Sequence, residues 1–137
     1  MNPFVWPLRV YWEDTDAGGI VFYANYLKFF ERARTEWFRS LGYSQQELKD
    51  TTGCMFIVSQ TQLKYSHPAL LDDELHISTK VSEVGGASLV IEQSAMKRDP
   101  LSDRTVVLCE GSIRIAWVQV GSLKPSRIPK DILQSIL

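Results

Sequence analysis

The segment ANYLKFFERARTEWFRSLG, from Ala24 to Gly42, decides the fold of this chain. Its charged residues occupy other faces than its apolar residues, which recur every three or four positions at Tyr26, Phe29, Phe30, Ala33, Trp37 and Leu41. This spacing predicts an amphipathic helix of about five turns, since 3.6 residues complete each turn. Gly42 follows the last apolar position, and we expect it to adopt the left-handed conformation that ends many helices.

A strand and a turn are predicted before the helix. Apolar and polar side chains alternate from Leu8 to Glu13, which is typical of a β-strand. The sequence DTDAGG, from Asp14 to Gly19, then interrupts the alternation. Aspartate side chains bond nearby backbone N–H groups and glycine adopts positive φ, so this segment is predicted to be a loop of defined shape.

After the helix we expect a loop of Gln, Lys, Asp and Thr, followed by four strands in hairpin succession. The alternating patterns that predict these strands cover Met55–Tyr65, Leu75–Val81, Leu89–Ala95 and Val106–Val120. Gly85-Gly86 and Asp99–Asp103 are the expected turns between the later strands, and Gly111 is the expected position of a β-bulge. The tail beyond Gly121 is expected to end in a short helix.

One long helix and five mostly antiparallel strands predict an α+β fold, with the helix across the concave face of the sheet. The buried stripe of the helix is expected to contain Phe29, Phe30, Ala33 and Trp37. A single helix covers only part of such a sheet, and open sheet edges pair with other strands. We therefore expect a homodimer or a homotetramer.

Length and composition limit the classes of protein to which this chain can belong. The 137 residues suit one domain, residues 1–137, and 45% hydrophobic with 23% charged residues is typical of a globular chain. A net charge of -1 excludes the basic field of a general nucleic-acid binder. Cys54 and Cys109 form no metal or disulfide pattern, and no targeting segment or membrane span is recognisable. We expect a cytoplasmic protein without metal or cofactor.

The densest group of unusual residues is EDTDAGGIVFYANY, from Glu13 to Tyr26, where the first strand meets the helix. The first N–H groups of a helix have no internal partner and carry partial positive charge, so they can bind an oxyanion. A nearby carboxylate can act as a nucleophile or can deprotonate water. Asp14 and Asp16 equally suit a purely structural role in the turn, and the residues alone leave both interpretations open.

The stretch RVYWEDTDAGGIVFYANYLKFFERARTEW, from Arg9 to Trp37, resembles the opening motif of the hotdog-fold acyl-CoA thioesterases. It is most similar to the YbgC-type branch, which is associated with the Tol-Pal envelope system, and more distantly to 4-hydroxybenzoyl-CoA thioesterase. The resemblance continues through YSHPALLDDEL, from Tyr65 to Leu75, and LKPSRIPKDI near the C-terminus. It implies a hotdog fold, in which one long central helix is wrapped by a five-stranded sheet.

The resemblance also implies site residues. The second aspartate of the family's turn is catalytic and falls on Asp16, either as nucleophile or as general base. The backbone N–H that polarises the carbonyl falls on Tyr23, whose ring is either part of the site or part of the core. Asn25 is expected to contact substrate or to start the helix. The implied substrate is an acyl-CoA with a short-chain or aromatic acyl group, or the thioester of an acyl carrier protein.

Several other residues are candidates for contacts to the substrate. The turn that is basic in 4-hydroxybenzoyl-CoA thioesterase is Val84-Gly85-Gly86-Ala87-Ser88 here, so contacts to the phosphates of coenzyme A must come from elsewhere. The candidates are Lys64, Lys97, Arg98 and Arg104, each also suited to a solvated strand end. The candidate residues for the acyl pocket are Phe22, Phe29, Phe30, Phe56 and Trp37. His67 and His76 are expected to be structural.

Two rival functions stay open. A non-catalytic module that binds acyl thioesters or an acyl carrier protein could share the fold, although binding alone needs no carboxylate beside the carbonyl. A hotdog dehydratase would use a catalytic histidine, and no histidine lies near the predicted helix in the sequence. The favoured prediction is therefore an acyl-CoA thioesterase.

Overall fold

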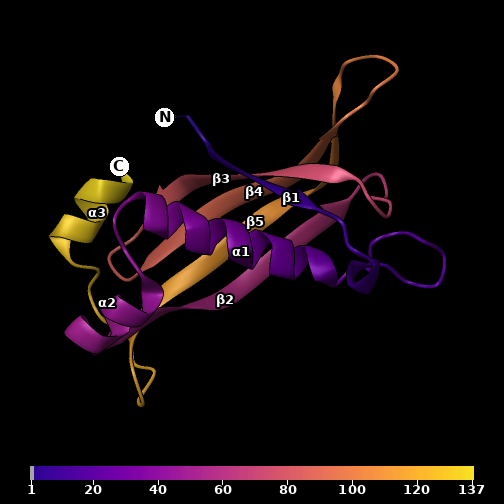
Figure 1. The fold of residues 1–137 in the computed structure, drawn as a ribbon. Helices are drawn as coiled ribbons and strands as arrows, with labels where there is room; N and C mark the ends of the chain where they lie inside the picture. Colours follow the sequence, from indigo (N-terminus) through magenta and orange to yellow (C-terminus); the bar gives the residue numbers. More distant parts are fainter. Residues whose placement is uncertain (1) are drawn as a thin grey trace.

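The computed structural model describes residues 2–137 as a long helix lying on a curved antiparallel sheet (Figure 1). Among these residues the sheet has five strands in the spatial order β1-β3-β4-β5-β2. The strands are β1 (Phe4–Arg9), β2 (Cys54–Tyr65), β3 (Glu74–Val84), β4 (Ser88–Arg98) and β5 (Thr105–Gln119). The helices are α1 (Asn25–Ser40), α2 (Gln45–Thr52) and α3 (Lys130–Ile136), with a short 3₁₀ turn, η1 (Trp12–Asp14). The predicted α+β architecture is confirmed.

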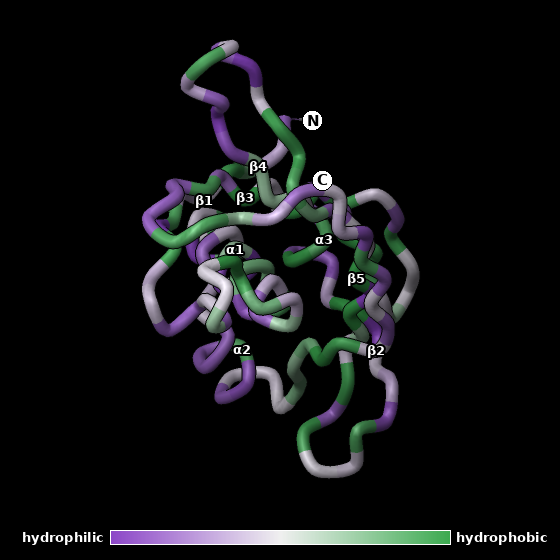
Figure 2. The backbone as a smooth tube through the Cα atoms, turned by 90° about the vertical axis from the view of Figure 1, so that its right-hand side faces the viewer, coloured by the Kyte–Doolittle hydropathy of each residue, from purple (hydrophilic) through white to green (hydrophobic). Residues whose placement is uncertain are grey.

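Helix α1 packs its apolar stripe against the sheet as predicted. Phe29, Phe30 and Ala33 are fully buried, and Trp37 is nearly so. Hydrophilic and hydrophobic stretches alternate along the helix and the strands, as one-sided burial requires (Figure 2). Gly42 has φ +93°, which confirms the left-handed end of the helix.

A buried polar group fixes the position of α1 on the sheet. The Arg34 guanidinium donates to Gln93 Oε1 on β4 at 2.9 Å. Gln93 Nε2 donates in turn to the Phe30 carbonyl at 3.0 Å and to Thr79 Oγ1 on β3 at 2.9 Å. Burial lowers the pKa of Arg34, because desolvation disfavours its charged form. Through Gln93, these hydrogen bonds connect one part of the helix to two adjacent strands, β4 and β3.

Three of the predicted elements are wrong in position or kind. The first strand is Phe4–Arg9 rather than Leu8–Glu13, because η1 begins at Trp12 and the Asp14 carboxylate accepts the Tyr11 N–H at 2.8 Å. The expected loop after α1 contains helix α2, which begins after the capping residue Ser44. Strand β2 does not pair with β3 in a hairpin; it crosses to the far edge and pairs with β5. The strands β3, β4 and β5 do follow one another as predicted.

Gly111 is not a bulge. It lies in regular register, opposite Leu63 on β2 and Gln93 on β4, and the ladder between β4 and β5 shifts at Leu108 instead. A Cβ atom at Gly111 would lie 1.8 Å from the Gln62 carbonyl oxygen. Glycine is required here because the backbone of β2 approaches too closely for any side chain.

We predict that Gly111→Ala lowers the free energy of unfolding by about 3 kcal/mol, because β2 must move away from β5 to admit the methyl group. Gly86→Ala is the matched control: a Cβ there meets no atom within 4 Å, and the change should stay within about 0.5 kcal/mol. Urea unfolding followed by circular dichroism measures both. Equal stabilities of the two variants would contradict the close approach of β2.

Candidate active site

The loop before α1 is closed by its own backbone. Thr15 and Val21 form an antiparallel bridge, and within it the Asp16 N–H donates to the Ile20 carbonyl at 2.9 Å. Gly19, with φ +80°, allows its N–H to donate back to the Asp16 carbonyl at 3.1 Å. The predicted loop of defined shape is therefore a tight turn with Asp16 near its tip.

Asp14 ties this loop to the start of α1. Its carbonyl accepts both the Phe22 N–H at 3.0 Å and Asn25 Nδ2 at 2.8 Å. Its carboxylate is buried and accepts the Tyr11 N–H, which makes Asp14 a capping residue. The structural interpretation of the aspartate pair therefore holds for Asp14. Of the two roles expected for Asn25, the structure shows the one at the helix start.

Asp16 keeps one carboxylate oxygen available. Its Oδ1 accepts the Gly18 N–H at 2.8 Å, which is the turn bond expected of an aspartate in such a loop. No hydrogen bond or ion pair among residues 2–137 uses its Oδ2, and the residue is exposed. The turn bond orients the carboxylate and leaves Oδ2 free to react.

The backbone N–H of Tyr23 is also available. It donates to no group in residues 2–137. The Tyr23 carbonyl accepts the Tyr65 hydroxyl at 3.1 Å, which fixes the orientation of the backbone at this point. Tyr23 is 64% exposed, so of the two positions considered for its ring, the structure excludes the one in the core. An N–H without a partner at the start of a helix is suited to bind an oxyanion.

A cleft of about 260 Å³ opens beside Tyr23. Its walls come from the loop before α1, from Tyr26 on the first turn of the helix, and from the segment after β2. The lining residues are Ile20, Val21, Tyr23, Tyr26, Tyr65, Ser66, His67 and Pro68. Of the two predicted catalytic residues, Tyr23 therefore lines the cleft, whereas Asp16 does not.

The sequence pattern did not predict that His67 lines this cleft. This histidine is distant from the helix in the sequence, but β2 returns the chain to the start of α1, so His67 lines the same cleft as Tyr23. A histidine therefore does lie near the start of the helix in space, although none lies near it in the sequence. His76 lies on β3, where its Nε2 is 3.8 Å from Glu74 Oε1.

The tyrosines of the cleft are held in place. Tyr65 packs edge-to-face on Tyr23 and Tyr26, with ring centroids 6.2 Å and 5.7 Å apart. The Tyr26 hydroxyl accepts the Ala69 N–H at 3.3 Å. Burial raises the pKa of both Tyr26 and Tyr65, so both are neutral phenols at pH 7.

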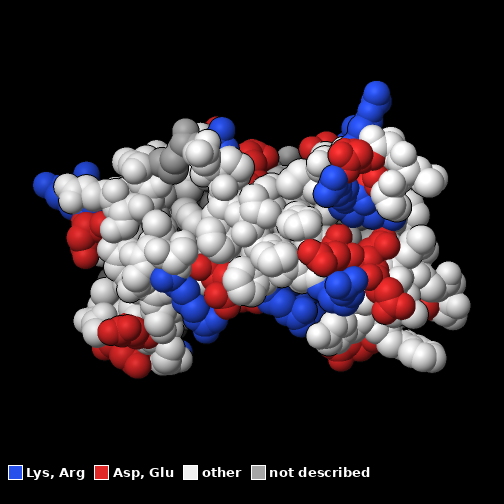
Figure 3. Space-filling model, turned by 45° about the horizontal axis from the view of Figure 1, so that its top comes forward, with Lys and Arg blue, Asp and Glu red and all other residues white. Residues whose placement is uncertain are grey.

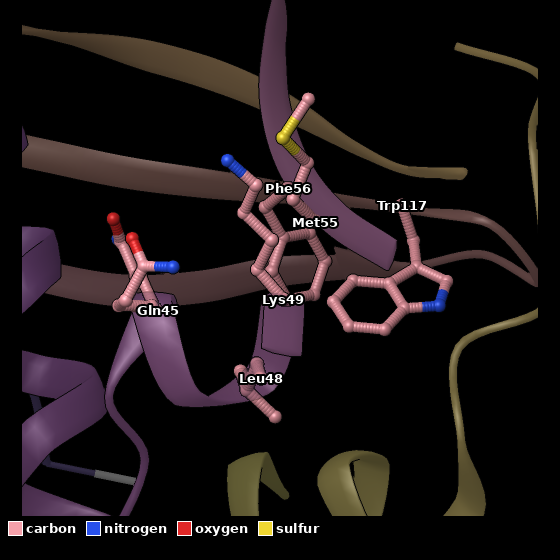
Figure 4. Close-up of a pocket in the computed structure, with 7 residues that line it drawn as sticks. Gln45, Leu48, Lys49, Met55, Phe56 and Trp117 are labelled. Carbon is pink, nitrogen blue, oxygen red and sulfur yellow. The ribbon is translucent and has the colours of Figure 1, made fainter. Parts of the chain in front are cut away.

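The predicted acyl-pocket aromatics do not gather at one place. Phe29, Phe30 and Trp37 belong to the core between α1 and the sheet, whereas Phe22 is exposed. Phe56 lines a separate cavity of about 190 Å³ with Lys49, Met55 and Trp117 (Figure 4). This cavity is lined in part by α2. Helix α2 lies at the opposite end of α1 from the loop that precedes α1 (Figure 1).

The cysteine thiols are unsuited to nucleophilic catalysis. Both are free and buried, and desolvation raises the pKa of Cys109 to about 12.

Within residues 2–137 no three His, Cys, Asp or Glu side chains gather as a metal site. No helix in the same range has the length and apolar character needed to cross a membrane. Acidic and basic side chains intermingle on the face shown in Figure 3, without a field of one sign.

Comparison with known proteins gives consistent matches over nearly the whole chain. The profile of the thioesterase-like superfamily matches residues 10–136. The acyl-CoA thioesterase YbgC of Haemophilus influenzae is 44% identical over 131 residues, which cover 96% of this chain and 92% of that protein. A probable thioesterase from Bartonella henselae superposes with a TM-score of 0.85 at 32% identity, covering 93% of this chain and all of that one.

A crystal structure of a mutant 4-hydroxybenzoyl-CoA thioesterase in complex with 4-hydroxybenzoyl-CoA superposes with a TM-score of 0.93. The match covers 100% of both chains at 19% sequence identity. This likeness shows the fold, which is the hotdog fold that the opening motif implies.

We predict that neither cysteine reacts with iodoacetamide in the native protein at pH 8, because both are buried and Cys109 stays a thiol far below its raised pKa. In concentrated urea both should be alkylated. Intact-mass spectrometry counts the adducts in each state. Rapid labelling of Cys109 in the folded protein would contradict its burial.

Proposed function

The chain belongs to the thioesterase-like superfamily, and on this premise we propose that Asp16 and the backbone N–H of Tyr23 carry out the hydrolysis of an acyl-CoA thioester. The chain is an acyl-CoA thioester hydrolase. The residue assignment is supported by two groups near the start of α1 that form no hydrogen bond within residues 2–137. One is the Tyr23 N–H and the other is Oδ2 of Asp16, on a loop that Asp14 and Asn25 tie to the helix.

In the proposed reaction, the thioester carbonyl oxygen accepts the Tyr23 N–H, which stabilises the negative charge that develops there. Asp16 then acts by one of two routes. Either its carboxylate attacks the carbonyl carbon, expelling the coenzyme A thiolate and forming a mixed anhydride that water hydrolyses, or it takes a proton from the water that attacks. The tetrahedral intermediates differ between the two routes, but in both the carbonyl oxygen becomes negatively charged when the thioester is attacked, and both routes release a free acid and coenzyme A.

The proposed substrates are short-chain or aromatic acyl-CoA, with the thioester of an acyl carrier protein as the alternative carrier. The similar proteins are named for acyl-CoA and for 4-hydroxybenzoyl-CoA, which supports this range. A non-catalytic binding module of the same fold is the rival, and it would have no use for a free carboxylate oxygen at Asp16. The proposed compartment is the cytoplasm, which the two free thiols support.

The phosphates of coenzyme A need cations that are not already paired. Lys97 bonds Asp73 at 3.1 Å and Arg98 pairs with Asp103, so both are engaged. Lys64 and Arg104 form no ion pair with any residue from 2 to 137. These two are the better candidates for phosphate contacts.

We also propose a homodimer or homotetramer built through the outer edge of β2. Both edge strands of the sheet are open, but β1 is short and Pro7 removes one of its donors. Strand β2 has 12 residues and no proline, and it carries exposed Val58 and Tyr65. A second copy on this edge would also cover the cleft beside Tyr23, which Tyr65 lines.

Asp16→Asn should lower kcat/KM for acyl-CoA hydrolysis by about 100-fold or more, because an amide is neither a nucleophile nor a base. Its Oδ1 can still accept the Gly18 N–H, so the loop and the fold should persist. Thiol release from a panel of acyl-CoA substrates measures the loss.

Glu13→Gln is the control for charge removal on the same segment, since Glu13 is exposed and accepts no bond from the helix start. It should retain nearly the wild-type rate. A wild-type rate for Asp16→Asn would exclude the proposed role of Asp16, and no thiol release from any substrate by the unaltered protein would favour the binding module.

Light scattering coupled to gel filtration should give two or four times the chain mass of 15.6 kDa. Val58→Lys should shift the protein toward the monomer, because it places a charge on the β2 edge. Val5→Lys, on the similarly exposed valine of β1, should leave the assembly intact. A wild-type monomer at assay concentration would refute the proposed assembly.

A further inference from the structure

The cleft beside Tyr23 contains an imidazole that has no structural role of its own. The segment after β2 is held by its backbone: the Ser66 and His67 N–H groups both donate to the Leu108 carbonyl, at 2.8 Å and 3.2 Å. The His67 side chain is exposed, and among residues 2–137 it forms no hydrogen bond or ion pair. Its position is therefore fixed by the backbone, while both of its ring nitrogens are free to meet a ligand.

The rest of the cleft is mostly aromatic, and its phenols are largely engaged. The Tyr65 hydroxyl donates to the Tyr23 carbonyl, and the Tyr26 hydroxyl accepts the Ala69 N–H. Ser66 and His67 are the side chains of the segment after β2 that offer unused hydrogen-bonding groups to the cleft. The cleft thus combines ring surfaces with a small polar patch, which is the arrangement that fixes the orientation of a bound group.

The position of the cleft determines which part of a substrate could reach His67. The Tyr23 N–H is the proposed contact of the thioester carbonyl, and Tyr23 itself lines the cleft. An acyl group extending from that carbonyl into the cleft would pass between the tyrosine rings and His67. A volume of about 260 Å³ lies just below the range that is typical of ligand pockets, roughly 300–1,000 Å³. It suits a short chain or a single ring.

We propose that His67 is a specificity-determining residue that hydrogen-bonds an oxygen on the acyl group, so that the enzyme favours hydroxylated acyl-CoA over the apolar isostere. A neutral imidazole both donates and accepts, and can therefore pair with a hydroxyl group in either direction. A site built to bond a hydroxyl group discriminates against an analogue that lacks it, because its own polar groups then lose their partners. This inference rests on the proposed function, since it takes the carbonyl oxygen to be at Tyr23.

The test compares two pairs of substrates that differ by one hydroxyl group: 3-hydroxybutyryl-CoA with butyryl-CoA, and 4-hydroxybenzoyl-CoA with benzoyl-CoA. The wild-type enzyme should show a higher kcat/KM for the hydroxylated member of at least one pair. His67→Ala should lower that preference about tenfold, the effect of one lost hydrogen bond with its desolvated partner. His67→Gln, which keeps a donor and an acceptor, should restore part of it.

His76→Ala is the matched control, since it removes the other histidine, which lies on β3 and is not among the residues that line the cleft. It should preserve the preference. No preference in the wild-type enzyme, or an equal loss for both members of a pair in His67→Ala, would overturn the inference while leaving the proposed function standing. Absence of thiol release from all four substrates by the wild-type enzyme would overturn both.

Discussion

Burial of the α1 stripe within the curve of the sheet is the constraint on which the rest of the structure depends. Phe29, Phe30 and Ala33 have no exposed surface, so the sheet must wrap the helix closely on one side. Each fully buried large apolar side chain stabilises the fold by about 1.5–3 kcal/mol, so this contact contributes several kcal/mol. The Arg34–Gln93–Thr79 group adds direction to it, because a displaced helix would leave buried polar atoms without partners.

The same packing determines where the reactive groups lie. Because the helix is fixed along its length, its first turn is held at one end of the sheet, beside the segment that follows β2. The helix start has no side-chain cap, a feature that is commonly worth about 1 kcal/mol. Asp14 compensates from the loop side by holding both Phe22 and Asn25.

Strong local patterns in the sequence predicted much of the fold correctly. The helix, its glycine end and the strands β3, β4 and β5 were each determined by periodicity within a few neighbouring residues. Helix α2 was missed because it buries only Leu48 and shows almost no apolar periodicity. The pairing of β2 with β5 was missed because alternation indicates which face of a strand is buried, and carries no information on the identity of a distant partner. The close approach of β2 at Gly111 follows from that pairing.

By itself, the sequence determined the helix, the turn before it and the family that its motif resembles, and that resemblance implied Asp16 and the Tyr23 N–H as candidate groups. These depend on residue type and short spacing, which a linear pattern contains. Only the tertiary structure decided that Asp14 is a buried cap, that Asp16 keeps one free oxygen, and that His67 shares a cleft with Tyr23. The physical reason is that β2 returns the chain to the start of α1, and that return depends on long-range strand pairing.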